Sequence, residues 1–295
     1  MIVGTEAVVG AWINAFIVMM CCIDRFKNKF LGAGDKILMF LAANRFCFLI
    51  AGMLQELYRT LSPAIYYKYI HRGVRAILWF FISSNLWLAA CLCVFYCVKI
   101  ANFNHSLFIY LKLKISSTVP VLLLGSELLS LVNTFPFFSM IYIPQGDIPN
   151  ATATGNITVN QIQRHTDLFK IFLYCGLGFF VVLVIFIISA LLLLISLWQH
   201  ARQLRDGFSG YRSPRMATHV RAVKIITYFL VTYLVNFVAL MVLLMDIFSE
   251  DSALNTLCTV IVYACPSMHS VMLILTNPKF KKAFLQTLQR GSCKW

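Results

Sequence analysis

A few polar residues lie inside long apolar stretches of this 295-residue chain, and they are the first candidates for chemistry. Asn14, Arg45 and Ser270 fall in three different stretches. Because a guanidinium stays charged, Arg45 must find hydrogen-bond acceptors if its stretch is buried. If the three stretches pack together, these residues would form a polar knot. Such a knot either ties helices together or acts as a switch with two arrangements.

Glu127, in the run SELLSL, is an acid inside another apolar stretch. It could couple proton movement in a transporter, or it could be protonated or hydrogen-bonded to a neighbour. We favour the second interpretation, because the sequence offers no other acid at that depth to relay a proton.

An aromatic and polar stripe runs along one further stretch. Trp79, Ser83 and Leu86 share one face at helical spacing, and Asn236 lies within another apolar stretch. A stripe of this kind is either core packing or the wall of a pocket for a small, largely apolar ligand.

Signatures of enzymes and metal sites are missing from the sequence. It has no H-E-x-x-H, G-x-S-x-G or P-loop motif, and its six histidines are scattered. The ten cysteines do not follow zinc-ligand spacing. We therefore expect no catalytic residue, no metal and no cofactor.

The composition predicts a membrane protein, because 60% of the residues are hydrophobic and only 12% are charged. We expect an all-α fold in one domain over residues 1–295, a seven-transmembrane helix bundle with a short amphipathic surface helix at 278–288. The predicted spans cover residues 3–23, 36–57, 74–98, 119–141, 168–198, 222–247 and 254–276.

The distribution of Lys and Arg predicts the orientation of the bundle. Eighteen of the 25 basic residues fall in the first, third and fifth connections and the tail, and acidic residues lean to the other side. Basic residues gather on the cytoplasmic side, so we expect the N-terminus outside and the C-terminus inside. The net charge of +14 has the same explanation, and we expect no nucleic-acid partner.

Two glycosylation triplets fall in one hydrophilic connection, predicted as a loop over residues 142–167. They begin at Asn150 and Asn156, and such sites are used only on the outer side. Both support the predicted orientation, although a third triplet at Asn104 falls on the predicted inner side.

Several ordered motifs resemble one receptor family. Seven helices with an outer N-terminus suggest a G-protein-coupled receptor, yet the rhodopsin-class motifs are missing. The sequence instead resembles the type 2 (bitter) taste receptors over nearly its whole length. The matching motifs are Leu41–Arg45 (LAANR), Phe95–Phe103 (FYCVKIANF), Ser196–His200 (SLWQH), His219–Lys224 (HVRAVK), and His269-Ser270 followed by Asn277–Lys281 (NPKFK).

The resemblance implies a chemosensory receptor in the plasma membrane that binds bitter small molecules in the outer half of the bundle. The family's pocket positions fall on Leu78, Ile82, Asn236 and Thr259, and we add Trp79 and Ser83 from the aromatic stripe. Many members have an acid where this chain has Thr259. The resemblance therefore predicts a neutral, moderately apolar ligand.

The resemblance also implies that the inner ends of the helices activate a gustducin-type G protein. We expect coupling or switching roles for Asn14, Arg45, Tyr96, Lys99, His200, His219, Lys224, His269 and Ser270. Basic residues on this side would also favour anionic membrane lipid. The alternative is a small-solute transporter or channel, although we find no internal repeat or paired helix breaks. An integral-membrane enzyme would need a catalytic set that the sequence lacks.

Overall fold

The computed structural model describes residues 2–28, 30–66, 70–101, 106–139, 154–206, 214–245 and 252–292, and these residues are helical almost throughout. The predicted all-α fold is confirmed, with no strand in these ranges. The helices are α1 (Ile2–Asn28), α2 (Ala33–Leu61), the short α3 (Pro63–Ile65), α4 (His71–Ile100), α5 (Ser106–Ser139), α6 (Thr154–Asp206), α7 (Pro214–Met245), α8 (Ala253–Thr276) and α9 (Pro278–Ser292).

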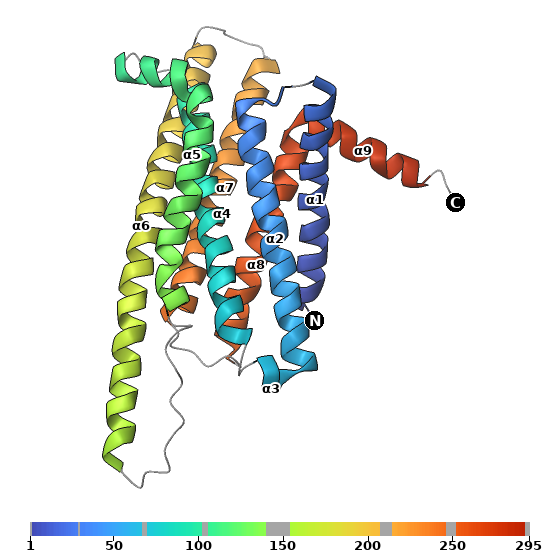
Figure 1. Ribbon diagram of the computed structural model, residues 1–295. Helices are drawn as coiled ribbons and strands as arrows, with labels where there is room; N and C mark the ends of the chain where they lie inside the picture. The colour runs from blue at the N-terminus through green and yellow to red at the C-terminus, as the bar shows by residue number, and fades with distance from the viewer. Residues whose placement is uncertain are drawn as a thin grey trace.

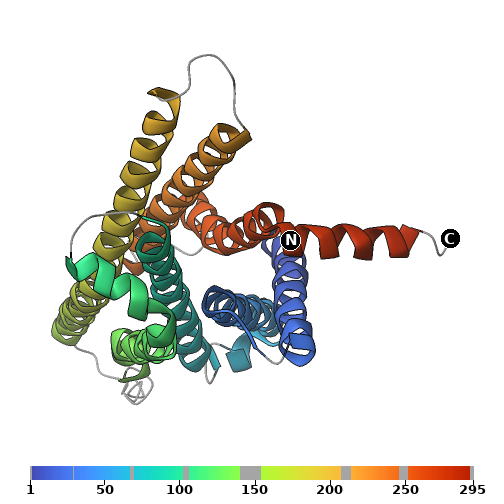
Figure 2. The same cartoon turned by 90° about the horizontal axis from the view of Figure 1, so that it is seen from above.

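The long helices form a closed ring with one helix outside it (Figures 1 and 2). Around the ring, neighbours pack in the order α1, α2, α4, α6, α7, α8 and back to α1, while α5 packs mainly on α4. We call the end of the bundle where α1 begins the Ile2 end. The opposite end, where α8 passes into α9, is the α9 end.

Seven of the described helices are long and apolar enough to cross a membrane, as predicted. Their outer faces carry exposed large apolar side chains, among them Trp12, Leu124 and Leu177. Such a surface would be unfavourable in water, whereas lipid tails solvate it.

Three helices begin well before the predicted starts, namely α5, α6 and α7, the last at Pro214 rather than near 222. The membrane-capable parts of α6 and α7, Phe169–Gln199 and Ala222–Met245, nevertheless agree with the predicted spans. The fourth spanning helix, α5, begins at Ser106 rather than near 119, so Lys112 and Lys114 lie within a helix and not in a connection. The fifth, α6, begins at Thr154 rather than near 168, and it extends beyond its neighbours at the Ile2 end in Figure 1. Hydropathy marks where a helix can enter lipid, not where its hydrogen bonds begin.

The C-terminal surface helix begins where predicted. Pro278 cannot continue α8, because it lacks an N–H group, but it suits the first turn of a new helix. Asn277 caps that turn by accepting a 3.0 Å hydrogen bond from the Lys279 backbone N–H. The helix α9 then projects sideways from the bundle and ends at Ser292 rather than 288 (Figure 1).

The buried core has two main parts along the bundle. The first surrounds Trp79, Phe179 and Leu240, and the second, towards the α9 end, surrounds Leu88, Phe95 and Phe280. The helices α1, α2, α4 and α8 contribute to both parts, so these four connect the two ends.

Candidate functional site

A cavity of about 520 Å³ lies at the Ile2 end, between α2, α4 and α8. This volume is in the range of small-molecule sites. Four of the six predicted ligand residues line it: Leu78, Trp79 and Ile82 from α4 and Thr259 from α8. The helix α4 presents the first three together because positions three and four residues apart share a helical face.

Aromatic rings form much of the wall. Trp79 is 7% exposed and stacks on Phe137, with 5.0 Å between ring centroids, and on Phe179 at 6.0 Å. On the other side, Phe48 stacks on Tyr263 at 4.8 Å. Packed rings hold one another in place, so these walls are preorganised for an apolar ligand.

The other two predicted ligand residues lie elsewhere. Ser83 is fully buried, and its hydroxyl accepts a 3.4 Å hydrogen bond from Asn133 of α5. It therefore faces α5 and not the cavity. Asn236 lines a separate cavity of about 30 Å³, deeper in the bundle. Spacing along one helix could not reveal this, because the partner helix decides which face is open.

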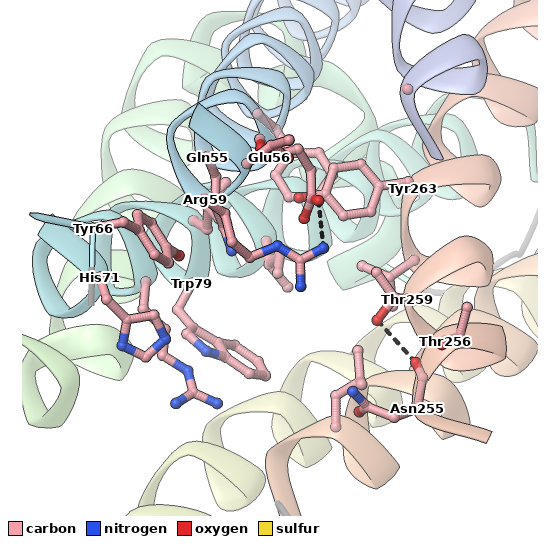
Figure 3. Close-up of a pocket in the computed structure, with 18 residues that line it drawn as sticks. Gln55, Glu56, Arg59, Tyr66, His71, Trp79, Asn255, Thr256, Thr259 and Tyr263 are labelled. Atoms are coloured by element: carbon pink, nitrogen blue, oxygen red, sulfur yellow. Dashed lines mark hydrogen bonds and ion pairs between the residues drawn. The ribbon is translucent and has the colours of Figure 1, made fainter. Parts of the chain in front are cut away.

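Ionisable and amide groups that sequence reasoning did not assign to the site also line the large cavity. Glu56 and Arg59 come from α2, and His71 and Arg75 from α4. Arg59 Nη2 lies 2.7 Å from Glu56 Oε2, and Figure 3 shows this pair between the aromatic side chains and α8. The sequence does carry a signal for this lining, since Glu56, Arg59 and Arg75 lie near two predicted helix ends on the same side of the membrane.

Two of the uncharged polar groups in the lining could bond to a ligand. The Thr259 hydroxyl donates a 2.9 Å hydrogen bond to the Asn255 carbonyl of its own helix, as Figure 3 shows. Its oxygen can therefore still accept a hydrogen bond from a ligand. The Gln55 Oε1 atom is buried and accepts no hydrogen bond from the residues that the structure describes, so a ligand donor could pair with it.

The predicted polar knot is present in the middle of the bundle. Arg45 is 3% exposed; its Nε donates to Asn85 Oδ1 at 2.8 Å and its Nη1 to Ser270 Oγ at 2.9 Å. Ser270 Oγ in turn donates to Asn14 Oδ1 at 2.7 Å. The knot thus joins α1, α2, α4 and α8, and its member Asn85 was not among the candidates.

The small cavity adjoins this knot. Arg45, Asn85, Asn236 and His269 are among its lining residues. His269 packs against Phe229 of α7, with 4.1 Å between ring centroids. Neither Asn236 Oδ1 nor His269 Nδ1 has a hydrogen-bond partner among the described residues. These groups extend the polar region from α8 to α7.

Glu127 is hydrogen-bonded to a neighbouring helix, in agreement with the interpretation favoured from the sequence. Its Oε1 atom accepts a 2.8 Å hydrogen bond from Ser84 Oγ of α4. The contact agrees with the interpretation of Glu127 as a residue that joins α5 to α4.

At the α9 end, a small cluster joins α4, α6 and α7. Its buried members are Cys97, Leu193 and Leu197, and Tyr96 packs against it together with Ala222, Val223 and Ile226. Lys99 and Lys224 are exposed at the same end. His200 lies in α6 and His219 in α7, but both fall outside the residues whose side chains the structure describes.

The side chains of both predicted glycosylation residues lie outside what the structure describes. Asn150 lies outside the described residues. Asn156 lies in the first turns of α6 rather than in a loop, and its side chain is not described.

The helix α9 is tied to the bundle by charge. Lys279 Nζ forms an ion pair with Asp24 of α1 and lies 3.6 Å from Asp35 Oδ2 of α2. Partial burial lowers the pKa of Lys279, but the Asp24 hydrogen bond and the Asp35 charge outweigh it, and the net pKa is raised. The Lys279 side chain therefore holds three helix ends together.

The described residues form seven membrane-capable helices, with a ligand-sized cavity at one end and a buried polar knot beneath it, and this defines the class as a seven-helix membrane protein. Comparison with known proteins refines this. Residues 1–292 match the family described as "Taste receptor protein (TAS2R)".

Individual relatives agree. The chain is 33% identical to taste receptor type 2 member 40 of Gallus gallus, with 94% of this chain and 89% of the relative covered. It is 33% identical to taste receptor type 2 member 9 of Macaca mulatta, with 98% and 92% covered. It is 32% identical to the Homo sapiens member 9, with 99% and 93% covered.

The chain belongs to the type 2 taste receptor family, and the resemblance predicted from its motifs is confirmed. It is a bitter-taste chemosensory receptor of the G-protein-coupled class, a multi-pass membrane protein and not an enzyme.

Proposed function

We propose that this receptor binds bitter small molecules in the large cavity and activates a gustducin-type G protein at the α9 end. The Ile2 end then faces the outside of the cell and the α9 end the cytoplasm, in the plasma membrane. The carrying observation is that four residues predicted from sequence to contact ligand line one 520 Å³ cavity, which opens among helices that also hold the polar knot.

The ligand would be small, largely apolar and without a positive charge. Trp79, Ile82 and Val262 offer it apolar surface, and Thr259 offers a hydrogen-bond acceptor. The acid Glu56 is already paired with Arg59, so it is poorly placed to attract an amine.

Two helices supply a route from cavity to cytoplasm. From the cavity inward, α4 carries Trp79, Asn85 and Tyr96, and α8 carries Thr259 and Ser270. Arg45 bonds to both helices, so a ligand that shifts α4 against α8 must rearrange its hydrogen bonds. A ligand shifts an equilibrium only if it binds the two arrangements unequally.

The G protein would bind at the α9 end, where α4, α6 and α7 meet around Tyr96. Opening these helix ends would expose a groove for a helix of the Gα subunit. Lys99 and Lys224 are exposed there and would favour acidic partners or anionic lipid.

The test expresses the chain in cells with and without a gustducin-type G protein and records intracellular calcium against a panel of bitter compounds. We expect a dose-dependent response that requires the G protein. The variant Ile82→Trp tests the location of the site, because the larger side chain should fill the cavity and abolish the response at unchanged surface expression. Solute flux without any need for a G protein would instead support the transporter or channel alternative.

A further inference from the structure

The first turn of α9 is joined to the ends of α1 and α2 by charge and by packing. Lys279 Nζ forms an ion pair with Asp24 of α1 and lies 3.6 Å from Oδ2 of Asp35, which belongs to the first turn of α2. Next in the chain, the Phe280 side chain is fully buried in the core cluster at the α9 end. The start of α9 therefore holds the start of α2 in place.

The start of α2 in turn touches α4. A Cβ atom added at Gly34 would lie 3.1 Å from Cε1 of the Phe95 ring, so the glycine backbone and this ring are in close contact. Phe95 is 2% exposed and belongs to the same buried cluster as Phe280. Because a packed core leaves little free space, a shift of the α2 start requires Phe95 to move.

Phe95 supports two of the residues that we expect at the G-protein site. Its ring makes an edge contact with Tyr96, with 5.7 Å between the ring centroids, and Lys99 Nζ lies 5.3 Å from the Phe95 centroid. A cation over an aromatic face is attracted to the ring. Tyr96 packs against the cluster that joins α4, α6 and α7. One chain of contacts thus runs from α9 through α2 to the end of α4.

We propose that Lys279 and Asp35 are positioning residues for G-protein activation. Their charge contact holds the α2 start against Phe95, which holds Tyr96 and Lys99 in the arrangement that the Gα subunit meets. This rests on the proposed function for the roles of Tyr96 and Lys99, whereas the linkage from α9 to α4 rests on the contacts themselves. Lys279 is 40% exposed, so water screens its charge, and we expect effects of about fivefold rather than larger ones.

The first arm of the test needs no G protein. Backbone amide hydrogen exchange of purified receptor in lipid nanodiscs, read by mass spectrometry, reports local opening of helix ends. Lys279→Met should speed exchange about fivefold in residues 36–41 and 95–100 and leave residues 74–80, at the other end of α4, unchanged. Lys279→Arg keeps the charge and should restore the wild-type rates. Lys282→Met removes an exposed charge from the same helix and should change neither segment.

The second arm measures calcium signalling at matched surface expression. Lys279→Met should raise the half-maximal agonist concentration about fivefold. The charge swap of Lys279→Glu with Asp35→Lys should recover most of this loss, since it leaves one ammonium group beside two carboxylates at the same junction. Lys279→Arg should behave like the wild type.

A double-mutant cycle locates the route. Phe95→Leu removes the ring that connects α2 to Lys99. If the effect of Lys279 passes through this ring, Lys279→Met should add less than about twofold in the Phe95→Leu background, whereas independent sites add their effects. Gly34→Ala perturbs the same contact from the α2 side without emptying the core, and it replaces Phe95→Leu in the cycle if that variant fails to reach the surface.

The two proposals can fail separately. Faster exchange in Lys279→Met without any G-protein response from the wild type would contradict the proposed function and leave the linkage standing. Unchanged exchange in both segments would overturn the linkage. Unchanged agonist potency in Lys279→Met, an equal loss in Lys279→Arg, or full additivity in the cycle would overturn the positioning role.

Discussion

Arg45 and Ser270 are 225 positions apart in the chain, yet Arg45 Nη1 donates a 2.9 Å hydrogen bond to Ser270 Oγ in the middle of the bundle. The same hydroxyl donates to Asn14 Oδ1 at 2.7 Å. One serine therefore satisfies a buried arginine from α2 and a buried amide from α1. Hydrogen bonds of this kind matter in lipid, because unpaired polar groups there have no water to bind.

Ser270→Ala should destabilise the receptor by about 1.5–3 kcal/mol, since it leaves donors of Arg45 and the Asn14 oxygen without a partner. The thermal unfolding midpoint of purified protein measures this. Ser117→Ala is the matched control, because the exposed Ser117 hydroxyl bonds only to its own helix. A change at Ser270 no larger than at Ser117 would mean that the knot adds little to stability.

Asn236→Leu should raise stability by about 1 kcal/mol, because the buried Asn236 oxygen has no hydrogen-bond partner in the described part of the chain and leucine is similar in size. The thermal unfolding midpoint of purified protein again measures the change in stability. Because Asn236 lines the small cavity and not the large one, agonist potency should change less than in Thr259→Val. A loss of potency in Asn236→Leu that equals or exceeds the loss in Thr259→Val would support the predicted role of Asn236 in ligand binding.

Gly52→Ala should weaken agonist potency. A Cβ atom at Gly52 would clash with the Tyr263 ring, which stacks on Phe48 and lines the large cavity. The ring must move, and displacing a wall of the site should cost about tenfold in half-maximal concentration. Gly125→Ala is the matched control, as nothing lies within 4 Å of its added Cβ. Equal potency in both variants would show that Tyr263 can shift without consequence for the ligand.

Tyr96→Ala should reduce coupling to the G protein by about tenfold in agonist potency while sparing surface expression. The side chain packs where α4, α6 and α7 meet, and removing it loosens the proposed groove. Lys99→Ala should have a smaller effect, since this side chain is exposed. Calcium responses normalised to surface protein provide the measurement, with the exposed Lys282→Ala in α9 as control. Normal coupling in both α4 variants would refute this location for the G-protein site.

Lys279→Met should loosen α9 and lower stability by less than about 1 kcal/mol, because the ion pair to Asp24 is partly exposed. The folded-state pKa of Lys279 is raised above its ordinary value near 10.4. The stabilisation should therefore be fully present below about pH 10 and fade as pH rises through the raised pKa. The difference in unfolding midpoint between wild type and variant, followed across that range, checks the sign. Lys282→Met should show no such dependence.

Much of this receptor was determined by the sequence alone. Hydropathy predicted seven spans, Pro278 predicted the start of α9, and ordered motifs such as LAANR around Arg45 predicted the family. These features depend on local composition and short-range spacing, so a single chain reports them directly. The need of Arg45 for acceptors also follows from its chemistry alone.

Tertiary structure decided which side chains meet. Ser83 and Trp79 lie four residues apart on one helix and both contact α5, yet only Trp79 also lines the cavity. Arg59 and Arg75 belong to different helices, and only their packing brings both charges to one cavity with Glu56. Contacts between helices depend on rotation and depth, which hydrophobic periodicity does not encode. The charge of the site is thus a property of the assembled bundle.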